Sequence, residues 1–363
     1  MESRQEMYIG IDLSEEWTQV SYYRPGMEEP ETVSTVAGEE RYRIPTDMEH
    51  LDVHLRKVIR YVPGMTDFSG IGAVTFHLAD MDMERVKLLK RIMEQLGVSR
   101  ERVFVQDDKE SFCHFAMHQA KELVQHQVVL FACEENKVTC LCLEKRERTR
   151  PVRVEIREIL QGELPKIFGE RDENFAQMAE EALKGKIVSS VYLTGDGLEG
   201  GWLCDSLHVL CRGRRAFQGK NLYSRGACYG SLYEAHKKEA GYIYFGDLVL
   251  SKNIFLKVNC GNQTFFHDLA EAGERCYEVE RSCQVLLNGE PSVDVWLKDP
   301  YSGETRIESL QLTDLPERPP KATRLLIETR GTGKGQLLVR VKDLGLGGWY
   351  PSSGKVWEYC IDE

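Results

Sequence analysis

The sequence predicts a two-lobed α/β domain followed by an all-β sandwich, and two observations support this. A hairpin of strands followed by alternating helices and strands occurs twice, beginning at Met7 and again at Val128. From Gly241 onward, strand-like runs recur roughly every eight to twelve residues, with turn signals between them. A repeated unit of this kind is typical of two similar lobes that face each other across a cleft. Short, evenly spaced strands are typical of a β-sandwich.

The first repeat opens with a hairpin formed by Met7–Asp12 and Thr18–Tyr23. Beyond it, stretches with apolar residues at helical spacing alternate with short apolar runs, a pattern that indicates amphipathic helices between buried strands. We expect, in order, a helix at Glu49–Tyr61, a strand at Gly72–His77, a helix at Met83–Leu96, a strand at Val103–Gln106 and a helix at about Glu110–Val124.

The second repeat opens with a hairpin formed by Val128–Ala132 and Val138–Leu143. The same alternation follows it and predicts the same kinds of element. We expect a strand at Val152–Glu158, a helix at Asp172–Leu183, a strand at Val188–Thr194 and helices at Trp202–Leu210 and Leu222–Ala235.

The last third of the chain contains only strand patterns. Turn signals such as Asn288-Gly289 separate its apolar runs. We expect an α/β domain over residues 1–240, a linker over 241–252 and a β-sandwich over 253–363. The sandwich strands are expected at Ile254–Val258, Gln263–Asp268, Gln284–Leu287, Val293–Leu297, Arg306–Leu312, Arg324–Thr329 and Leu337–Val341.

Composition excludes several classes of protein. The net charge of −11 argues against binding to nucleic acid or to anionic membranes. No apolar run approaches the ~18 residues of a membrane span, and the polar N-terminus has no apolar signal region. The 11 cysteines are scattered without a Cys-x-x-Cys pair, which is typical of free thiols in a reducing compartment. We therefore expect a cytoplasmic protein that binds neither nucleic acid nor membrane.

Two glycine-rich stretches invite a phosphate-binding interpretation. Gly195-x-Gly197-x-x-Gly200 follows a predicted strand and matches the dinucleotide pattern. A dinucleotide site needs an acidic residue ~20 positions further on, however, and that window is basic, "CRGRRAFQGKN". Gly331–Gly335 resembles part of a P-loop, but it joins two predicted strands and lacks the four-residue spacer. We interpret it as a hairpin turn.

The two hairpins carry a broader resemblance. "YIGIDLSEEWTQVSYY" (8–23) and "VVLFACEENKVTCLCL" (128–143) resemble the two phosphate loops of the superfamily that contains actin, sugar kinases and heat-shock-chaperone ATPases. "VFVQDDKESFCHFAMHQA" (103–120) resembles its strand and connecting helix, with Asp108 at the place of a metal-facing acid. "SSVYLTGDG" (189–197) resembles its adenosine-contacting turn, and "GKNLYSRGACYGSL" (219–232) its closing segment, which contains Gly226. The resemblance implies a reduced actin-like (ribonuclease-H-like) ATPase fold.

Within that superfamily the order of segments is similar to that of the seventy-kilodalton heat-shock chaperones. "GDLVL" (246–250) resembles their interdomain linker, with Asp247, Leu248, Val249 and Leu250 as the matching residues, although the same residues also fit a buried strand. "TRLLIETRGTGKGQLLVRVKD" (323–343) is similar to the last hairpin of their substrate-binding sandwich. Because the chain ends soon afterwards, we expect a sandwich without the helical lid of those chaperones.

The resemblance implies ATP or ADP with Mg²⁺ as the ligand. The matching candidates for nucleotide contact are Asp12, Ser14, Asp108, Gly195, Asp196, Gly197 and Gly226. Both loops depart from the family, however, because they carry Glu15-Glu16 and Glu134-Glu135 where small residues are expected. A carboxylate ~4 Å from a phosphate costs roughly 4 kcal/mol at an effective dielectric constant near 20. The superfamily's catalytic lysine has no clear counterpart. We therefore expect a vestigial site and assign no catalytic residue and no cofactor.

Metal binding is not favoured elsewhere in the sequence. His114, His118, Glu122 and His126 recur every four residues, but this spacing drifts around a helix and cannot bring all four to one ion. Asp12, Asp107 and Asp108 fit either a metal-water cluster or caps at the ends of strands. We assign no metal ligand.

Taken together, the residues and the resemblance predict a chaperone-like pseudo-ATPase that acts as a scaffold. Its β-sandwich is expected to bind a protein or peptide partner by strand addition. Two alternatives remain open, both enzymatic: a slow ATPase chaperone whose peptide binding is coupled to ATP, and a small-molecule kinase. A structural assembly subunit is a third alternative. The sequence leaves the partner and the oligomeric state open.

Overall fold

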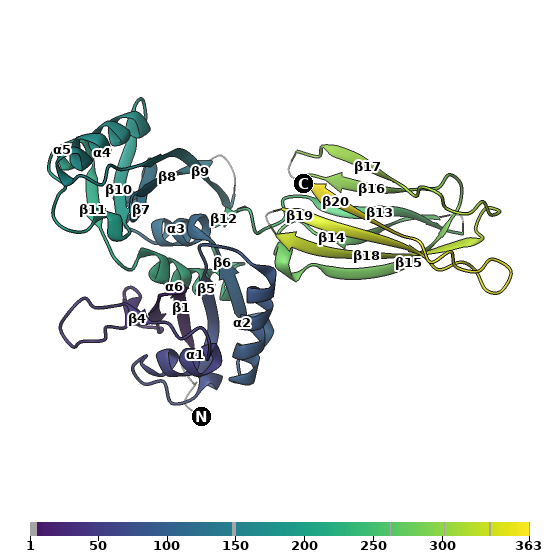
Figure 1. The fold of residues 1–363 in the computed structure, drawn as a ribbon, viewed down its shortest axis with the longest axis horizontal. Coiled ribbons are helices and arrows are strands. Elements are labelled where there is room, and N and C mark those ends of the chain that lie inside the picture. The colour runs from purple at the N-terminus through teal and green to yellow at the C-terminus, as the bar shows by residue number, and fades with distance from the viewer. Residues whose placement is uncertain (1–5, 147–149, 262, 301, 334, 363) are drawn as a thin grey trace. The chain divides into compact units, whose positions relative to one another are not determined.

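The computed structural model describes residues 6–146, 150–261, 263–300, 302–333 and 335–362. The chain divides into two compact units, Met1–Gly246 and Asp247–Glu363 (Figure 1). The first unit contains two α/β lobes and the second is built from strands. The prediction of a two-lobed α/β region followed by a β-rich region is therefore confirmed.

The first lobe is a six-stranded sheet with the order β3-β2-β1-β5-β6, in which β4 also pairs with β2. The hairpin strands β1 and β2 are antiparallel, whereas β1, β5 and β6 are parallel. The elements are β1 (Met7–Leu13), β2 (Trp17–Tyr23), β3 (Glu31–Thr32), β4 (Ile44–Pro45), α1 (Leu51–Arg60), η1 (Phe68–Gly70), β5 (Ile71–His77), α2 (Met83–Gln95), η2 (Arg100–Arg102) and β6 (Val103–Gln106).

The second lobe repeats this plan with the order β11-β10-β7-β8-β9-β12. Its hairpin strand β7 is antiparallel to β8 and parallel to β10, as β1 is to β2 and β5. The elements are β7 (Gln127–Glu134), β8 (Lys137–Arg146), β9 (Val152–Glu163), α4 (Phe168–Leu183), β10 (Val188–Thr194), η4 (Asp196–Leu198), α5 (Asp205–Leu210), β11 (Arg215–Gln218) and β12 (Tyr242–Tyr244).

Two helices lie between the sheets of the lobes, α3 (Asp108–Met117) and α6 (Leu222–Ala235) (Figure 1). Their backbones approach very closely, because a Cβ added to Gly226 would lie 2.1 Å from the carbonyl oxygen of Ser111. A Cβ on Gly10 of β1 would likewise lie 2.2 Å from the carbonyl oxygen of Ser224. Glycine at these two positions is what allows α6 to pack against both α3 and β1.

Three predicted helices have different boundaries in the structure. Helix α4 begins at Phe168, four residues before the expected Asp172. The helix expected at Glu110–Val124 ends at Met117, and a separate 3₁₀ turn, η3 (Lys121–Leu123), follows it. The ring of His118 donates a hydrogen bond to the carbonyl oxygen of His114 at 2.8 Å, and Gln119 donates to that of Phe115 at 2.9 Å. These side chains satisfy the last carbonyls of the helix and so favour its end at this point.

The helix expected from Trp202 begins instead at Asp205. The carboxylate of Asp172, on α4, accepts hydrogen bonds from the amides of Cys204, Asp205 and Ser206 at 3.1, 2.6 and 3.1 Å. A carboxylate from another helix thus serves as the N-terminal cap of α5. Local sequence cannot reveal a cap supplied from so far along the chain.

The second unit consists of two antiparallel sheets, with the orders β14-β13-β16-β17 and β15-β18-β19-β20. Both sheets contribute to one apolar core that includes Leu256, Val295, Ile327 and Val339. Its elements are β13 (Asn253–Cys260), β14 (Gln263–Ala270), η5 (Cys276–Glu278), β15 (Glu280–Leu287), β16 (Ser292–Lys298), β17 (Thr305–Gln311), β18 (Thr323–Gly333), β19 (Gln336–Asp343) and β20 (Val356–Asp362).

Two details of the second unit bear on the sequence predictions. The hairpin turn predicted at Gly331–Gly335 is confirmed as far as it is described, because β18 pairs with β19 as far as Gly333 and Gln336. Strand β20 was not predicted. Its partly buried side chains, such as Trp357 and Tyr359, alternate with exposed Glu358 and Cys360, a weak pattern that follows a stretch rich in glycine, proline and serine.

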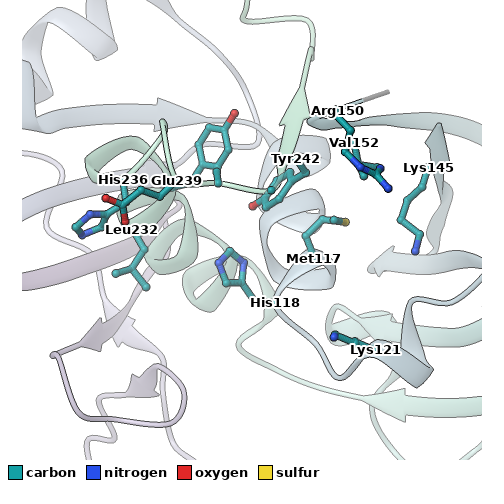
Figure 2. Close-up of a pocket in the computed structure, with 13 residues that line it drawn as sticks. Met117, His118, Lys121, Lys145, Arg150, Val152, Leu232, His236, Glu239 and Tyr242 are labelled. Atoms are coloured by element: carbon teal, nitrogen blue, oxygen red, sulfur yellow. The ribbon is translucent and has the colours of Figure 1, made fainter. Parts of the chain in front are cut away.

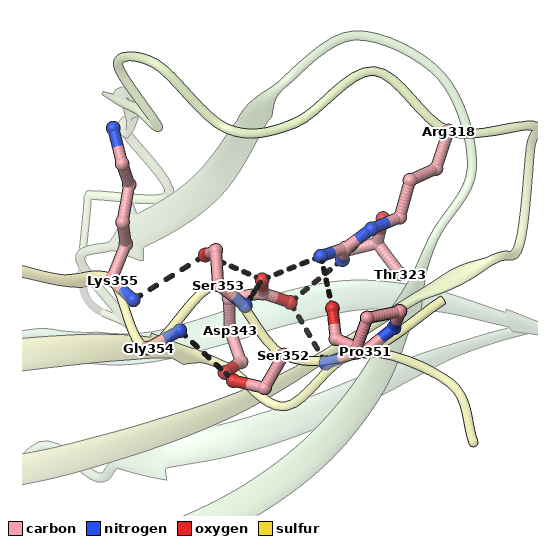
Figure 3. A network of polar contacts seen from close by, with 9 residues as sticks. Arg318, Thr323, Asp343, Pro351, Ser352, Ser353, Gly354 and Lys355 are labelled. Atoms are coloured by element: carbon pink, nitrogen blue, oxygen red, sulfur yellow. Dashed lines mark hydrogen bonds and ion pairs between the residues drawn. The ribbon is translucent and has the colours of Figure 1, made fainter. Parts of the chain in front are cut away.

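A buried ion pair fixes the segment that leads into β20 (Figure 3). Asp343 accepts hydrogen bonds from Arg318 at 2.8 and 2.9 Å, from the amide of Gly345 at 2.8 Å and from the hydroxyl of Ser353 at 2.6 Å. Burial opposes ionisation, but Arg318 and Ser353 hold the pKa of Asp343 well below its usual range.

The residues expected to form a linker take part in both units. Tyr242–Tyr244 form β12, which pairs with β9 in the first unit. Leu248, Val249 and Leu250 are buried within the second unit, where the amide of Leu250 donates to the carbonyl oxygen of Glu274 at 2.9 Å. The burial of these three residues fits the alternative interpretation of a buried strand-like segment.

Candidate functional site

The candidate site lies where three parallel strands of the first lobe end. Asp12 on β1 and His77 on β5 are partners in the parallel register, and Asp108 begins α3 shortly after β6. Because the carboxyl ends of parallel strands meet at the same edge of a sheet, the fold brings these three side chains together. Two of them, Asp12 and Asp108, are residues that the sequence predicted as nucleotide contacts.

His77 lies between the two carboxylates and contacts both. Its Nδ1 is 2.7 Å from Asp12 Oδ1 and its Nε2 is 2.7 Å from Asp108 Oδ1. His77 and Asp12 are only 3% and 5% exposed, whereas the side chain of Asp108 is 44% exposed. The imidazole ring also stacks on Tyr223, with ring centroids 4.3 Å apart and planes 9° apart.

The geometry requires both ring nitrogens to donate, which only the imidazolium ion can do. Burial by itself would lower the pKa of His77, but the charge of Asp12 and the hydrogen bonds to Asp108 and Asp12 raise it to about 10. His77 is therefore a cation at neutral pH. It forms a buried ionic bridge between the two carboxylates.

Further acidic groups surround this bridge. Burial, followed by the negative charges of Asp108, Asp196 and Asp12, raises the pKa of Glu134. Burial and the neighbouring carboxylates also raise the pKa of Tyr223 well above its usual value. Of the four loop glutamates noted in the sequence, Glu134 thus faces the cluster.

The turn between β1 and β2, the first loop, is closed by hydrogen bonds between its own residues. The amide of Ser14 donates to the carbonyl oxygen of Trp17 at 3.0 Å, and the amide of Trp17 donates to Ser14 Oγ at 3.0 Å. Ser14 Oγ in turn donates to the Trp17 carbonyl oxygen at 2.8 Å. These two amides and the Ser14 hydroxyl are therefore engaged within the turn, while the side chains of Glu15 and Glu16 are exposed.

The second loop is held by groups from the same lobe. The amide of Glu135 donates to Asp196 Oδ1 at 2.9 Å. Arg171, which is 7% exposed, donates to Asn136 Oδ1 at 2.8 Å and to the carbonyl oxygen of Gly197 at 2.9 Å. Arg171 therefore ties the turn of the second hairpin to the η4 turn.

Two glycines of the dinucleotide-like pattern allow close packing of the backbone. A Cβ on Gly195, whose φ is 100°, would lie 2.1 Å from the carbonyl oxygen of Cys133, and a Cβ on Gly197 would lie 2.4 Å from Cys133 Sγ. The segment that follows β10 is the 3₁₀ turn η4. Both glycines are thus needed where η4 presses against the end of β7.

The predicted site residues therefore fall into separate groups. Asp12 and Asp108 meet at His77, Ser14 lies in the first turn, and the Gly195–Gly197 segment lies beside the second turn. Gly226 lies inside α6 against Ser111 of α3, as described above. The contact of these residues with a nucleotide stays a prediction.

The structure also bears on the alternative roles of the acidic and histidine residues, as strand-end caps or as metal ligands. Asp107 is the N-terminal cap of α3 and accepts from the amide of Glu110 at 2.8 Å, as expected of a cap at a strand end. His114 and His118 lie on or at the end of α3, whereas Glu122 lies in η3. Among the residues that the structure describes, no group of three or more side chains is placed to hold a metal ion.

His77 is the site residue that sequence reasoning missed. It closes the predicted strand Gly72–His77, and Asp12 closes the predicted first strand. Placing those two strands in parallel would have set the two residues side by side. A histidine at such a strand end, opposite an acid, was the signal available.

The chain belongs to the family of unknown function (DUF5716) C-terminal, whose family model matches residues 47–247. A second model, the domain of unknown function (DUF8552), matches residues 249–362. No curated protein matches the chain. In the part of the chain that is described, no helix has the length and apolar character needed to span a bilayer.

Several solved structures are similar to the chain. Component A of the (R)-2-hydroxyglutaryl-CoA dehydratase of Acidaminococcus fermentans is 10% identical, with a TM-score of 0.39 over 65% of this chain and 100% of its own. The ROK hexokinase of Thermus thermophilus is 13% identical, with a TM-score of 0.37 over 64% and 100%. A Bacteroides thetaiotaomicron protein with an actin-like ATPase fold and unknown function is 13% identical, with a TM-score of 0.35 over 61% and 95%.

These TM-scores lie below 0.5, so the duplicated strand order described above, rather than these matches, defines the fold of the first unit. None of the three structures is a heat-shock chaperone. The narrower resemblance to the chaperones therefore stays a prediction.

Proposed function

We propose that the first unit is an actin-like scaffold that does not hydrolyse nucleotide. The observation that carries this proposal is the cation supplied by His77 between Asp12 and Asp108. A divalent ion that used these carboxylates would have to displace an imidazolium ion already bonded to both at 2.7 Å. The protein itself thus supplies a counter-ion to these two carboxylates.

The surroundings support the same proposal. A phosphate approaching the two carboxylates would meet the carboxylate of Glu134, and such a pair at ~4 Å costs roughly 4 kcal/mol at an effective dielectric constant near 20. It would also find the amides of Ser14, Trp17 and Glu135 already bonded to other acceptors. Phosphate loops depend on backbone amides that are open to the ligand.

Isothermal titration of the full chain with Mg-ATP and Mg-ADP tests this proposal. We expect no binding up to about 1 mM nucleotide, which means a binding free energy no more favourable than about −4 kcal/mol. Binding with a Kd below about 10 μM, together with steady hydrolysis that Asp12→Asn abolishes, would overturn the proposal. That outcome would favour the slow ATPase chaperone.

We further propose that the second unit binds an extended polypeptide along β14. This strand ends its sheet, and its first six residues are exposed. Phe265 and Phe266 are 48% and 62% exposed on opposite faces of the strand. An edge strand with exposed apolar side chains is suited to pairing with an added strand.

A peptide array probed with the full chain tests this second proposal. We expect binding to apolar peptides, and we expect the double variant Phe265→Ser/Phe266→Ser to lose most of it. Ile307→Ser is the matched control, because Ile307 is 46% exposed on β17 at the opposite edge of the sheet. An array with no binders, or an equal loss in the control, would count against β14.

A further inference from the structure

A second site lies in the first unit, at the opposite ends of α3 and α6 from His77. A groove of about 1040 Å³ is lined by residues near the C-terminal ends of both helices, together with η3, β8, β9 and β12 (Figure 2). Asp108 begins α3, whereas Met117, which lines the groove, ends it. A helix of ten residues spans about 15 Å, so the groove is separate from the ionic bridge.

The groove is cationic in a chain that is acidic overall. Lys121, Lys145 and Arg150 line one end of it, and Figure 2 shows Met117 pointing between them. His118 and His236 also line it, and Glu239 is the one carboxylate among the described lining residues. Lys121, Lys145 and Arg150 therefore give the groove three cationic side chains in a chain whose net charge is −11.

The floor between these charges is apolar and firmly held. Tyr242 is 7% exposed, and its hydroxyl is 2.7 Å from His114 Nδ1. Tyr233 packs against Tyr242 with ring centroids 5.2 Å apart. Met117 and Leu232 also line the groove and add apolar surface to it.

The arrangement disfavours a compact phosphate ligand. Phosphate sites are commonly built on helix N-termini, but α3 and α6 both end at this groove. Two carbonyls near the end of α3 already accept hydrogen bonds from the side chains of His118 and Gln119, which weakens their repulsion of peptide carboxylates in the groove. Cations from three separate elements, with apolar surface between them, match acidic and apolar side chains spaced along a peptide.

We propose that this groove binds an acidic polypeptide segment of a partner protein. Aspartate or glutamate side chains of the segment contact Lys121, Lys145 and Arg150, and an apolar side chain packs against Met117. This inference rests on the groove alone. It can be tested independently of whether the His77 site binds nucleotide.

Fluorescence anisotropy with the full chain tests the proposal. The probe is a labelled peptide of alternating glutamate and leucine, and the control peptide has glutamine in place of glutamate. We expect the glutamate peptide to bind and the glutamine peptide to bind about tenfold more weakly or not at all. Binding should also weaken as salt rises from about 50 mM to about 300 mM, because the contacts are only partly buried.

Variants that reverse the charge of groove lysines test whether the peptide binds in the groove. Lys121→Glu/Lys145→Glu should weaken binding of the glutamate peptide about tenfold or more. The matched control, Lys57→Glu/Lys184→Glu, makes the same change in net charge at exposed lysines outside the groove and should leave binding within about twofold. Thermal melts of both variants establish that they are folded.

Four results would overturn the proposal. Three of them are the absence of binding by the wild type, equal binding of the glutamine peptide, and an equal loss in the control variant. Displacement of the peptide by inorganic phosphate at about its own concentration would also overturn it and favour a small-anion site. The peptide and salt measurements use the wild type, so the proposal remains testable if the groove variant does not fold.

Discussion

Raising the pH should remove the proton from His77 and, with it, part of the stability of the first unit. The pKa of His77 is about 10 in the folded chain, compared with an ordinary value of 6.5. Because the folded value is the higher one, the folded state binds this proton more tightly than the unfolded state does. The stabilisation is therefore fully present below about pH 6.5 and is lost as the pH rises through about 10.

The size of the effect follows from the difference between these two pKa values. One pKa unit corresponds to ~1.4 kcal/mol of differential interaction. A rise from 6.5 to about 10 therefore corresponds to at most about 5 kcal/mol of unfolding free energy. This is a large part of the ~5–15 kcal/mol that stabilises typical domains.

Urea unfolding of the wild type and of His77→Gln at a series of pH values measures this loss. Other groups titrate in both proteins, so the difference between the two curves reports His77. We expect that difference to change by several kcal/mol between about pH 6.5 and about pH 10. NMR titration of the 9 histidine rings gives a direct value, with the His77 resonance assigned by its absence from His77→Gln.

Two matched variants sharpen the test. Asp12→Asn should lower the pKa of His77 more than Asp108→Asn does, because the side chain of Asp12 is 6% exposed and that of Asp108 is 44% exposed. The reasoning would be refuted by a His77 resonance that titrates below about pH 8. Parallel stability curves for the wild type and His77→Gln would refute it as well.

Three further predictions concern packing and capping. Gly226→Ala should destabilise the first unit by ~3 kcal/mol, since its Cβ would lie 2.1 Å from the carbonyl oxygen of Ser111; a melting temperature within a degree or two of the wild type would contradict it. Asp343→Asn should cost ~3 kcal/mol in the second unit by leaving the charge of Arg318 unpaired, which urea unfolding monitored by tryptophan fluorescence measures. Asp172→Ala should cost about 1 kcal/mol through loss of the α5 cap, and faster amide hydrogen exchange confined to α5 would confirm that cause.

Features encoded within one segment were predictable from the sequence. Helix α6 (Leu222–Ala235) and strands β6 and β10 have the predicted boundaries, because the spacing of their apolar residues defines them locally. The duplicated hairpin also followed from local patterns, and it determined the strand order of both lobes.

Features that depend on a distant residue were not predictable in this way. The start of α5 depends on Asp172, which lies 33 positions before Asp205. The role of His77 depends on partners 65 and 31 positions away, Asp12 and Asp108. The sequence placed acids at the strand ends, but identifying His77 as their counter-ion also required the parallel pairing of β1 with β5.

Under the proposed function, two separate features oppose the binding of Mg-ATP at the His77 site, and either one would suffice by itself. Replacing the His77 cation with a neutral residue would leave Asp12 and Asp108 available to Mg²⁺, but Glu134 and the internally bonded turn amides would still oppose the phosphates. Removing the charge of Glu134 would leave the two carboxylates bonded to an imidazolium ion. Restoring nucleotide binding therefore requires changes at both places. A single substitution that created tight Mg-ATP binding would show that only one of the two features prevents binding.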